Sequence, residues 1–294
     1  MGQNYTSVNE YLQTCFGEKV YKLSLNAGLT CPNRDGTIST GGCAFCSEGG
    51  SGDFAMSEGS ITEQLENAKA LISQKTSCQK FIAYFQAFTN TYGPVEYLRK
   101  IFTEAISHPD VVVLSIATRC DCINDEILDL LVELNKIKPV WVEMGLQSIH
   151  PQTLKAMNCG YSFEQFKKTT SLLSDAGIDV IAHIILGLPG ETKAMMLDSV
   201  MEACKLPISG IKLQLLHVLK NTKLAEMYEQ KPWPMMTLEE YCSLIVECIS
   251  IIPENIIVHR ITGDGPRNLL IEPRWSTDKK RVLNTINQLL STRL

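Results

Sequence analysis

The chain has 294 residues, of which 45% are hydrophobic and 20% are charged, and its formal net charge is −5. This composition is ordinary for a globular protein with a large core, and the acidic balance excludes a general electrostatic attraction to nucleic acids or membranes. No apolar run approaches the ~20 residues of a membrane span, and the N-terminus lacks the basic and then apolar pattern of a signal peptide. We therefore expect a cytoplasmic protein that does not enter a membrane.

Strand and helix patterns alternate along most of the chain. Ser60 followed by Glu63 predicts a capping box at the start of a helix, and Gly177 predicts the end of another. The apolar patterns predict strands at 20–26, 81–85, 111–117, 140–146, 180–186 and 211–219, and helices at 60–73, 94–107, 124–137, 162–176, 192–206 and 238–252. Nearly continuous apolar strands joined by helices are typical of a parallel sheet that is covered on both faces. Periodicity alone does not distinguish an open doubly wound sheet from a partial barrel.

The loop after the first predicted strand is rich in Gly, Pro, Asn and Ser and contains Cys31, Cys43 and Cys46. A C-x2-C pair can place both sulfurs on one metal centre. No fourth ligand is near in sequence, because the next cysteine is Cys78 and the first histidine is His108. A structural zinc site needs four protein ligands, whereas three thiolates can hold a 4Fe–4S cluster and leave one iron open.

The chain has eleven cysteines in total, with no spacing that indicates a disulfide framework. We expect reduced thiols, with metal ligation in the loop. Cys204, Cys242 and Cys248 lie in helical patterns and are expected to pack in the core.

Cys43-Ala-Phe-Cys46 resembles the second half of the signature of radical S-adenosylmethionine (SAM) enzymes. The longer first spacing is similar to that of the group related to the Elongator catalytic subunit, and specifically to the bacterial YhcC/YtqA-type proteins. The resemblance covers roughly residues 5–291. It implies an α/β fold with a partial (βα)6 TIM-type barrel at residues 20–219, preceded by an N-terminal segment (1–19) and followed by a C-terminal extension (220–294).

The same resemblance implies the chemistry. Cys31, Cys43 and Cys46 would ligate a 4Fe–4S cluster, and SAM would bind its open iron. An electron from a donor such as flavodoxin or ferredoxin would cleave SAM to methionine and a 5′-deoxyadenosyl radical, which abstracts a hydrogen atom from the substrate. The protein would bind and orient the reactants and exclude water.

The residues just beyond the predicted strands are the other site candidates, because chemistry in parallel α/β folds sits at the carboxyl ends of the strands. The expected cofactor-binding residues are Phe45, Gln86, Asn90, Thr118, Arg119, Gln147, Ser148, His183 and Gly187. Glu143 and Lys212 lie inside apolar strands, where a buried charge is costly unless it is paired, so they either pair or line the cavity. With Gln214 and His217 they form the catalytic or substrate-facing set.

Some of these residues have a simpler structural interpretation. His183 fits a core histidine as well as a ligand contact, Gly187 fits a turn as well as a close cofactor approach, and Thr192 is expected to cap the next helix. Relatives commonly have Asn-Arg-Gly-His where this chain has Asn-Cys159-Gly-Tyr. An arginine near this point pairs with the SAM carboxylate in related enzymes. Because Cys159 cannot do so, Arg119 is the candidate substitute.

The C-terminal segment 259–294 differs in charge from the rest of the chain. It holds seven Lys and Arg and three acidic residues, for a net charge of +4, which leaves −9 for the remainder. Its RNA-binding candidates are Arg260, Arg267, Arg274, Lys279, Lys280 and Arg281. A solvated terminal helix explains the same composition. The resemblance favours tRNA as the partner and the side chain at position 5 of the wobble uridine as the target.

Two other functions remain open. One is a radical SAM enzyme with a small-molecule substrate. The other is a non-catalytic zinc-binding RNA or protein module in which Cys15 supplies the fourth ligand. Iron reconstitution distinguishes the last from the others, since it gives a coloured cluster only in a radical SAM protein.

Overall fold

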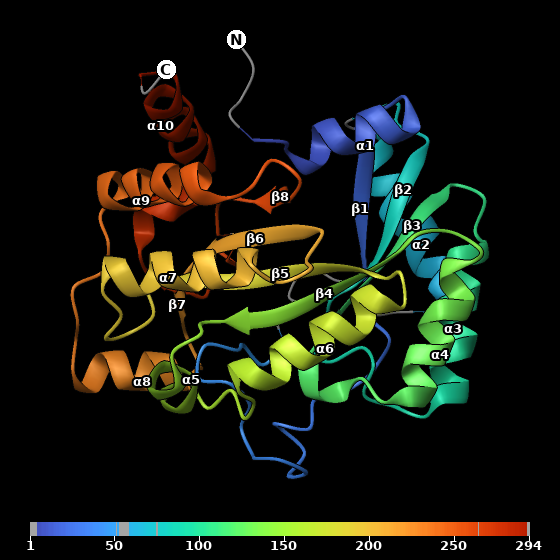
Figure 1. Ribbon diagram of the computed structural model, residues 1–294, viewed down its shortest axis with the longest axis horizontal. Coiled ribbons are helices and arrows are strands. Elements are labelled where there is room, and N and C mark those ends of the chain that lie inside the picture. The colour runs from blue at the N-terminus through green and yellow to red at the C-terminus, as the bar shows by residue number, and fades with distance from the viewer. Residues whose placement is uncertain (1–4, 51, 53–58, 75, 264, 293–294) are drawn as a thin grey trace.

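A sheet of seven parallel strands, in the order β1-β2-β3-β4-β5-β6-β8, forms the centre of the protein (Figure 1). The computed structural model describes residues 5–50, 52, 59–74, 76–263 and 265–292. The strands are β1 (Val20–Leu25), β2 (Lys80–Phe85), β3 (Val111–Thr118), β4 (Val140–Gln147), β5 (Asp179–Leu186), β6 (Gly210–Leu215) and β8 (Ile257–Arg260). Each of the six predicted strands corresponds to one of them.

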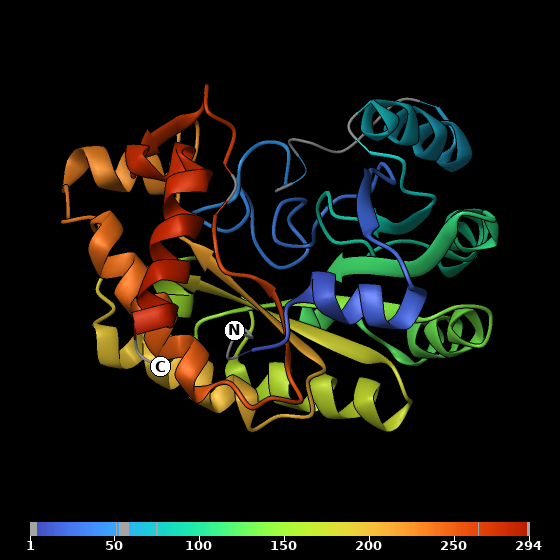
Figure 2. The same ribbon diagram turned by 90° about the horizontal axis from the view of Figure 1, so that it is seen from above.

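Helices cover the outer side of this sheet. They are α2 (Ile61–Ser73), α3 (Val95–Ser107), α4 (Asp125–Asn135), α6 (Phe163–Asp175), α7 (Lys193–Cys204) and α9 (Leu238–Ile251). The sheet is curved, and residues 26–50, which follow β1, lie on its inner side (Figure 2). The partial barrel is therefore confirmed, rather than an open doubly wound sheet.

Local sequence signals set the helix ends. At the start of α2 the Ser60 hydroxyl accepts a hydrogen bond from the Glu63 amide (3.2 Å), and the Ser60 amide donates to the Glu63 carboxylate (2.6 Å). Gly177 follows α6 with φ 73°, a conformation that favours glycine. Thr192 caps α7, because its hydroxyl accepts from the Met195 amide. The capping predictions at these three positions are confirmed.

The main apolar core fills the space between the sheet and the helices. The side chains of Cys242 and Cys248 on α9 are fully buried in it, and Cys204 on α7 packs against it half-buried. These three cysteines are structural, as their helical pattern predicts.

The C-terminal part departs from the predicted elements. The strand expected over 211–219 ends at Leu215, which is paired with Leu186, the last residue of β5. Beyond the end of its neighbour the chain turns, and β7 (Val218–Leu219) pairs antiparallel with β9 (Leu270–Glu272). The terminal helix considered for segment 259–294 is present as α10 (Lys279–Thr292). The further elements without a predicted counterpart are β8, α1 (Val8–Phe16), η1 (Cys120–Cys122), α5 (Pro151–Ala156), α8 (Lys223–Gln230) and η2 (Arg274–Thr277).

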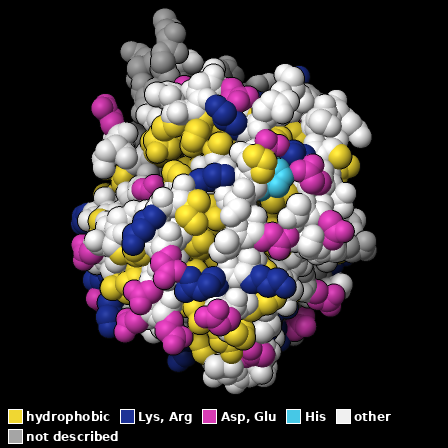
Figure 3. All heavy atoms as spheres, turned by 90° about the vertical axis from the view of Figure 1, so that its right-hand side faces the viewer, with side chains coloured by type: hydrophobic (Ala, Val, Ile, Leu, Met, Phe, Trp, Pro, Cys, Tyr) yellow, Lys and Arg dark blue, Asp and Glu magenta, His cyan; other side chains and the backbone are white. Residues whose placement is uncertain are grey.

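The face over α3 and α4 carries acidic and basic side chains close together (Figure 3). Among them Arg99 pairs with Glu133, and Lys69 lies between Glu66 and Asp110. This face offers no surface of a single charge sign. Among the described helices, none has the length and apolar character needed to span a membrane.

Candidate functional site

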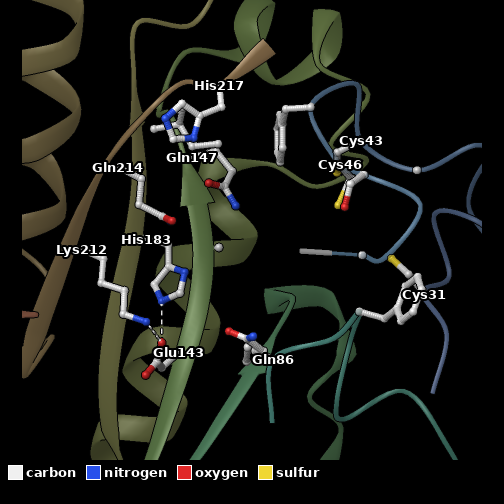
Figure 4. Close-up of a pocket in the computed structure, with 18 of the residues that line it drawn as sticks. Cys31, Cys43, Cys46, Gln86, Glu143, Gln147, His183, Lys212, Gln214 and His217 are labelled. Carbon is white, nitrogen blue, oxygen red and sulfur yellow. Dashed lines mark hydrogen bonds and ion pairs between the residues drawn. The ribbon is translucent and has the colours of Figure 1, made fainter. Parts of the chain in front are cut away.

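A pocket of about 420 Å³ opens at the carboxyl ends of the strands (Figure 4). Its lining comes from all seven strands of the main sheet, from the cysteine loop and from the segment that follows β8. The predicted site residues that line it are Cys31, Cys43, Phe45, Cys46, Gln86, Thr118, Arg119, Glu143, Gln147, His183, Lys212, Gln214, His217 and Arg260. The fold thus brings residues from positions 31 to 260 to one cavity.

The cysteine loop is fastened to the segment that follows α5. The Ala44 amide donates to the Met157 carbonyl (2.9 Å), and the Asn158 side chain donates to the Gly42 carbonyl (2.8 Å). Asn33 closes the arrangement, because its amide nitrogen donates to the Asn158 carbonyl (2.5 Å). These bonds hold the backbone on both sides of Cys43 in a fixed position.

Arg34 fixes the other end of the loop. Its guanidinium donates to the carbonyls of Cys46 (3.2 Å) and Ser47 and lies over the Phe88 ring. Gly42 leaves room for it, since a Cβ at that position would lie 2.8 Å from the Arg34 Nε atom. Arg34 is not among the site residues predicted from the sequence. Its position three residues after Cys31 is the signal that was available.

The three cysteines share the pocket but do not converge on one point. In the described part of the chain, no three His, Cys, Asp or Glu side chains are grouped so as to hold a single metal ion. Each cysteine of a 4Fe–4S cluster binds a different iron, so its sulfurs need not converge. Cys15 lies on α1 and does not line the pocket. This geometry gives no support to the zinc alternative.

Two further observations fit a cofactor in this pocket. The Asn33 side chain donates to the Cys43 sulfur (3.5 Å), a contact that stabilises a thiolate. In the absence of a metal, a hydrogen bond with the Cys159 thiol and burial raise the pKa of Cys43 well above its usual value. At the opposite wall, the side-chain oxygen of Gln147 (Oε1) is buried without a hydrogen-bond partner among the described residues. The donor set therefore suits a cluster and a polar ligand beside it.

The backbone at the end of β4 directs Gln147. This residue has φ 66°, in the left-handed region that residues other than glycine rarely adopt. Gly145 makes room for the turned side chain, because a Cβ at that position would lie 2.5 Å from the Gln147 Nε2 atom. Such strain is often found at ligand-binding sites.

The Arg119 side chain contacts two residues of the protein. Its guanidinium donates two hydrogen bonds to Asp121 (2.8 and 2.7 Å) and lies 5.0 Å from the centre of the Tyr161 ring. Burial alone would lower the pKa of Arg119, but the Asp121 carboxylate raises it. It stays positively charged, and it lies next to Gly160 in the segment where relatives have their arginine. Its role toward SAM stays a prediction.

Three predicted cofactor residues lie outside the pocket lining. Asn90 donates to the Ala117 carbonyl (3.0 Å) and so ties the β2 turn to β3. Ser148 donates to Glu191 (2.5 Å), and the Gly187 amide contacts the Met196 sulfur (3.1 Å). Asn90 and Ser148 thus join neighbouring strand ends, whereas Gly187 contacts the helix that follows its own strand. The side-chain oxygen of Asn90 is buried without a hydrogen-bond partner among the described residues. Contact of these three residues with the cofactor stays a prediction.

A buried charged network forms the floor of the pocket. Glu143 pairs with Lys22 and Lys212, and it accepts hydrogen bonds from Ser115 (2.7 Å) and His183 (3.0 Å), as Figure 4 shows in part. The predicted alternatives for Glu143 and Lys212, pairing or lining the cavity, both hold. Lys22 was missed. It occupies a polar position of the first alternating strand.

The pKa values in this network follow from burial and from neighbouring charges. Burial alone would raise the pKa of Glu143, but Lys212 and Lys22 hold it well below its usual range. Burial and the charge of Lys212 lower the pKa of His183 to about 4, so the ring is neutral at pH 7. Burial lowers the pKa of Lys212 while Glu143 opposes that shift.

His217 lies at the edge of the pocket, held by the segment after β8. One of its ring nitrogens is 3.0 Å from the Ser276 hydroxyl on η2. A Cβ at Gly263 would lie 2.4 Å from the ring, and one at Gly265 would lie 2.8 Å from it. Both glycines are therefore needed for the close packing of this segment on His217.

The other RNA-binding candidates lie on the C-terminal elements. Arg267 donates to the Thr277 carbonyl (2.9 Å), and Arg274 begins η2. Lys279, Lys280 and Arg281 form the first turn of α10. Arg260 differs from them, because it ends β8 and lines the pocket.

Comparison with known proteins agrees with this fold. A model of the radical SAM superfamily matches residues 31–203, and a model of the radical SAM C-terminal domain matches residues 208–292. The chain therefore belongs to the radical SAM superfamily, whose members are enzymes, and this membership implies a 4Fe–4S cluster and SAM.

Within the superfamily the chain is similar to proteins of the predicted group. It is 44% identical to the uncharacterized protein YtqA of Bacillus subtilis over 292 residues, which are 99% of this chain and 91% of that protein. It is 38% identical to protein YhcC of Escherichia coli K12, over 90% of this chain and 85% of that protein. The predicted relationship to the YhcC/YtqA group is confirmed.

More distant relatives connect the chain to the Elongator group. It is 29% identical to the tRNA uridine(34) acetyltransferase of Methanocaldococcus infernus over 55% of this chain and 30% of that protein. The solved structure of the archaeal M. infernus Elp3 with an N-terminal deletion has a TM-score of 0.68 at 19% identity, and covers 92% of this chain and 63% of that one. At this identity the structural likeness shows the fold alone.

Proposed function

We propose that this chain is a radical SAM enzyme that modifies the side chain at position 5 of the wobble uridine of tRNA. The observation that carries the enzymatic part is the joint position of Cys31, Cys43 and Cys46 in one pocket at the strand ends of a superfamily fold. These residues would hold the cluster. The bound cluster and SAM supply a 5′-deoxyadenosyl radical that abstracts a hydrogen atom from the substrate.

The remaining pocket residues have distinct tasks in this proposal. Asn33 and Arg34 fix the cysteine loop through their hydrogen bonds. The side-chain oxygen of Gln147 would accept a hydrogen bond from a hydroxyl or amino group of the cofactor. Arg119 places a positive charge beside Cys43 and Tyr161, where a carboxylate is stabilised. Burial of these groups excludes water from the reaction.

Two observations support tRNA as the substrate. The first is the similarity to a protein described as a tRNA uridine(34) acetyltransferase. The second is the position of Lys279, Lys280 and Arg281 in the first turn of α10, where positive charge opposes the helix dipole. A helix N-terminus with added cations is suited to phosphate. This turn begins three residues after Ser276, which contacts His217 at the pocket edge.

The proposed function is tested by nucleoside analysis of total tRNA from a strain that lacks the gene. We expect one modified wobble uridine to disappear and its precursor to accumulate, and the wild-type gene to restore it. A Cys46→Ala gene should not restore it. Unchanged tRNA nucleosides would reject tRNA as the substrate and favour a small molecule, with flavodoxin or ferredoxin still the expected electron donor.

A further inference from the structure

The floor of the pocket contains two cations side by side. Lys212 on β6 and Arg260 on β8 are partners in the register of these parallel strands, and both line the pocket. Like charges directly across two strands destabilise a sheet. Burial and the charge of Arg260 both act to lower the pKa of Lys212. A pair of this kind is costly unless something else offsets its charge.

The described residues do not supply enough negative charge to offset it. Glu143 is the carboxylate of this network, and it is already shared by Lys212, Lys22 and the neutral His183. No hydrogen bond or ion pair joins the Arg260 side chain to another described residue. Lys22, Lys212 and Arg260 therefore face a single carboxylate, and the floor has an excess of positive charge.

We propose that Arg260 and Lys212 bind an anionic group of the substrate, a carboxylate or a phosphate. This inference rests on the proposed function, because it assigns part of the substrate of the same pocket. An arginine fork binds such a group through two parallel hydrogen bonds, and a lysine adds a point charge. Gln214 follows Lys212 by two residues on the same face of β6 and adds an amide donor.

The position of the pair separates this group from the cluster. Figure 4 shows Lys212 and Gln214 on one side of the pocket and Cys31 and Cys46 on the other. A ligand group held at the cysteines is therefore not the one that Lys212 reaches. The anion belongs to the molecule that shares the pocket with SAM.

The test uses the full chain with its cluster reconstituted and SAM bound. Acetate and inorganic phosphate are titrated separately by calorimetry into wild type, Arg260→Gln and the control Arg99→Gln, which removes an exposed arginine of α3. We expect saturable binding of at least one anion to wild type and to the control. Binding to Arg260→Gln should be about ten- to a hundred-fold weaker.

A melting experiment distinguishes a binding residue from a structural one. Because Arg260 has a cationic neighbour and no ion-pair partner among the described residues, Arg260→Gln should raise the Tm of the ligand-free protein by roughly 1–3 °C. A lower Tm would show that Arg260 stabilises the fold and would overturn the inference.

Three binding results would also overturn the inference. The first is no anion binding by wild type, and the second is equal anion affinity of wild type and Arg260→Gln. The third is competition between SAM and the anion, because it would assign the site to the cofactor. These measurements need neither tRNA nor turnover. A tRNA that is modified normally by an Arg260→Gln enzyme with unchanged anion affinity would leave the proposed function intact and reject only this inference.

Discussion

Glu143 is a fully buried carboxylate whose charge is stabilised by basic side chains from three different strands. A buried charge without a partner costs several kcal/mol, and removing one partner of a buried pair leaves the other uncompensated. Lys22, Lys212 and His183 therefore fix one another through Glu143. This shared carboxylate sets the charge of the pocket floor.

His183 makes the stability of the protein sensitive to acid. Its folded pKa is about 4, whereas an unperturbed histidine has a pKa of ~6.5. Between these pH values the unfolded chain binds a proton that the folded chain does not bind. The free energy of unfolding therefore falls as pH is lowered through this window, by up to about 3 kcal/mol from this residue.

Urea unfolding of the cluster-free protein from pH 7 to pH 4.5 checks this prediction. His183→Gln should flatten the fall, while His108→Gln, which removes a ring paired with Glu66 outside the pocket network, should follow wild type. Equal pH dependence of wild type and His183→Gln would contradict a neutral, buried His183.

Single alanine variants test which cysteines ligate the cluster. Replacing any one of Cys31, Cys43 or Cys46 by alanine should abolish cluster assembly and SAM cleavage, because each sulfur holds its own iron. Cys204→Ala and Cys248→Ala should keep both, since these thiols lie on α7 and α9 outside the pocket. The visible absorption of reconstituted protein measures assembly. A full cluster in Cys43→Ala would show that the ligand set is different.

Among the secondary-structure elements, α10 offers the clearest test of RNA binding, because three basic residues lie in its first turn. Replacing Lys279, Lys280 and Arg281 by glutamine together should weaken tRNA binding. If all three contact phosphates, the slope of log affinity against log salt should become less steep by roughly 2–3. The buried face of this helix, which includes Val282 and Ile286, is left unchanged.

A matched control removes the same charge elsewhere. Arg99 and Lys167 lie on α3 and α6, and Lys205 directly follows α7, all on the outer side of the barrel, and their side chains are exposed. Their triple glutamine variant should keep the wild-type salt slope. If the α10 variant does so too, this turn does not contact tRNA.

The sequence predicts elements well where a local pattern is strong. The alternating strands and the Ser60 and Thr192 caps were predictable, because each depends on residues a few positions apart. The seventh strand was not, since β8 has only four residues and its pattern, Ile-Val-His-Arg, is not distinctive. Arg260 was consequently grouped with the outer basic residues, although the register of β8 places it beside Lys212.

Some residues of the candidate site could be predicted from the sequence, and others could not. The cysteines were predictable from spacing, and Glu143 and Lys212 from their charge within apolar strands. The sequence could not show that Ser148 turns toward Glu191 or that Lys22 reaches Glu143, because the residues of these pairs are 43 and 121 positions apart in the chain. Strand-end position indicates the edge of the sheet, but not the direction of each side chain.

At the scale of the whole molecule, charge is unevenly distributed along the chain. The chain has a net charge of −5, yet its last 36 residues carry +4, and within this segment Ser276 contacts His217 at the pocket edge. We expect long-range attraction of RNA to be weak and to be localised at this edge. In the proposed function, the pocket would receive the nucleotide that the C-terminal elements bring near.

The central claim is that a hydrogen atom passes from tRNA to SAM-derived 5′-deoxyadenosine in this pocket. The most direct measurement uses tRNA from the deletion strain grown in deuterated medium, incubated with reconstituted enzyme, a reductant and SAM. The product is analysed by mass spectrometry. We predict deuterium in 5′-deoxyadenosine with wild type, and no 5′-deoxyadenosine with Cys46→Ala. Unlabelled 5′-deoxyadenosine, formed at the same rate with and without tRNA, would contradict the claim.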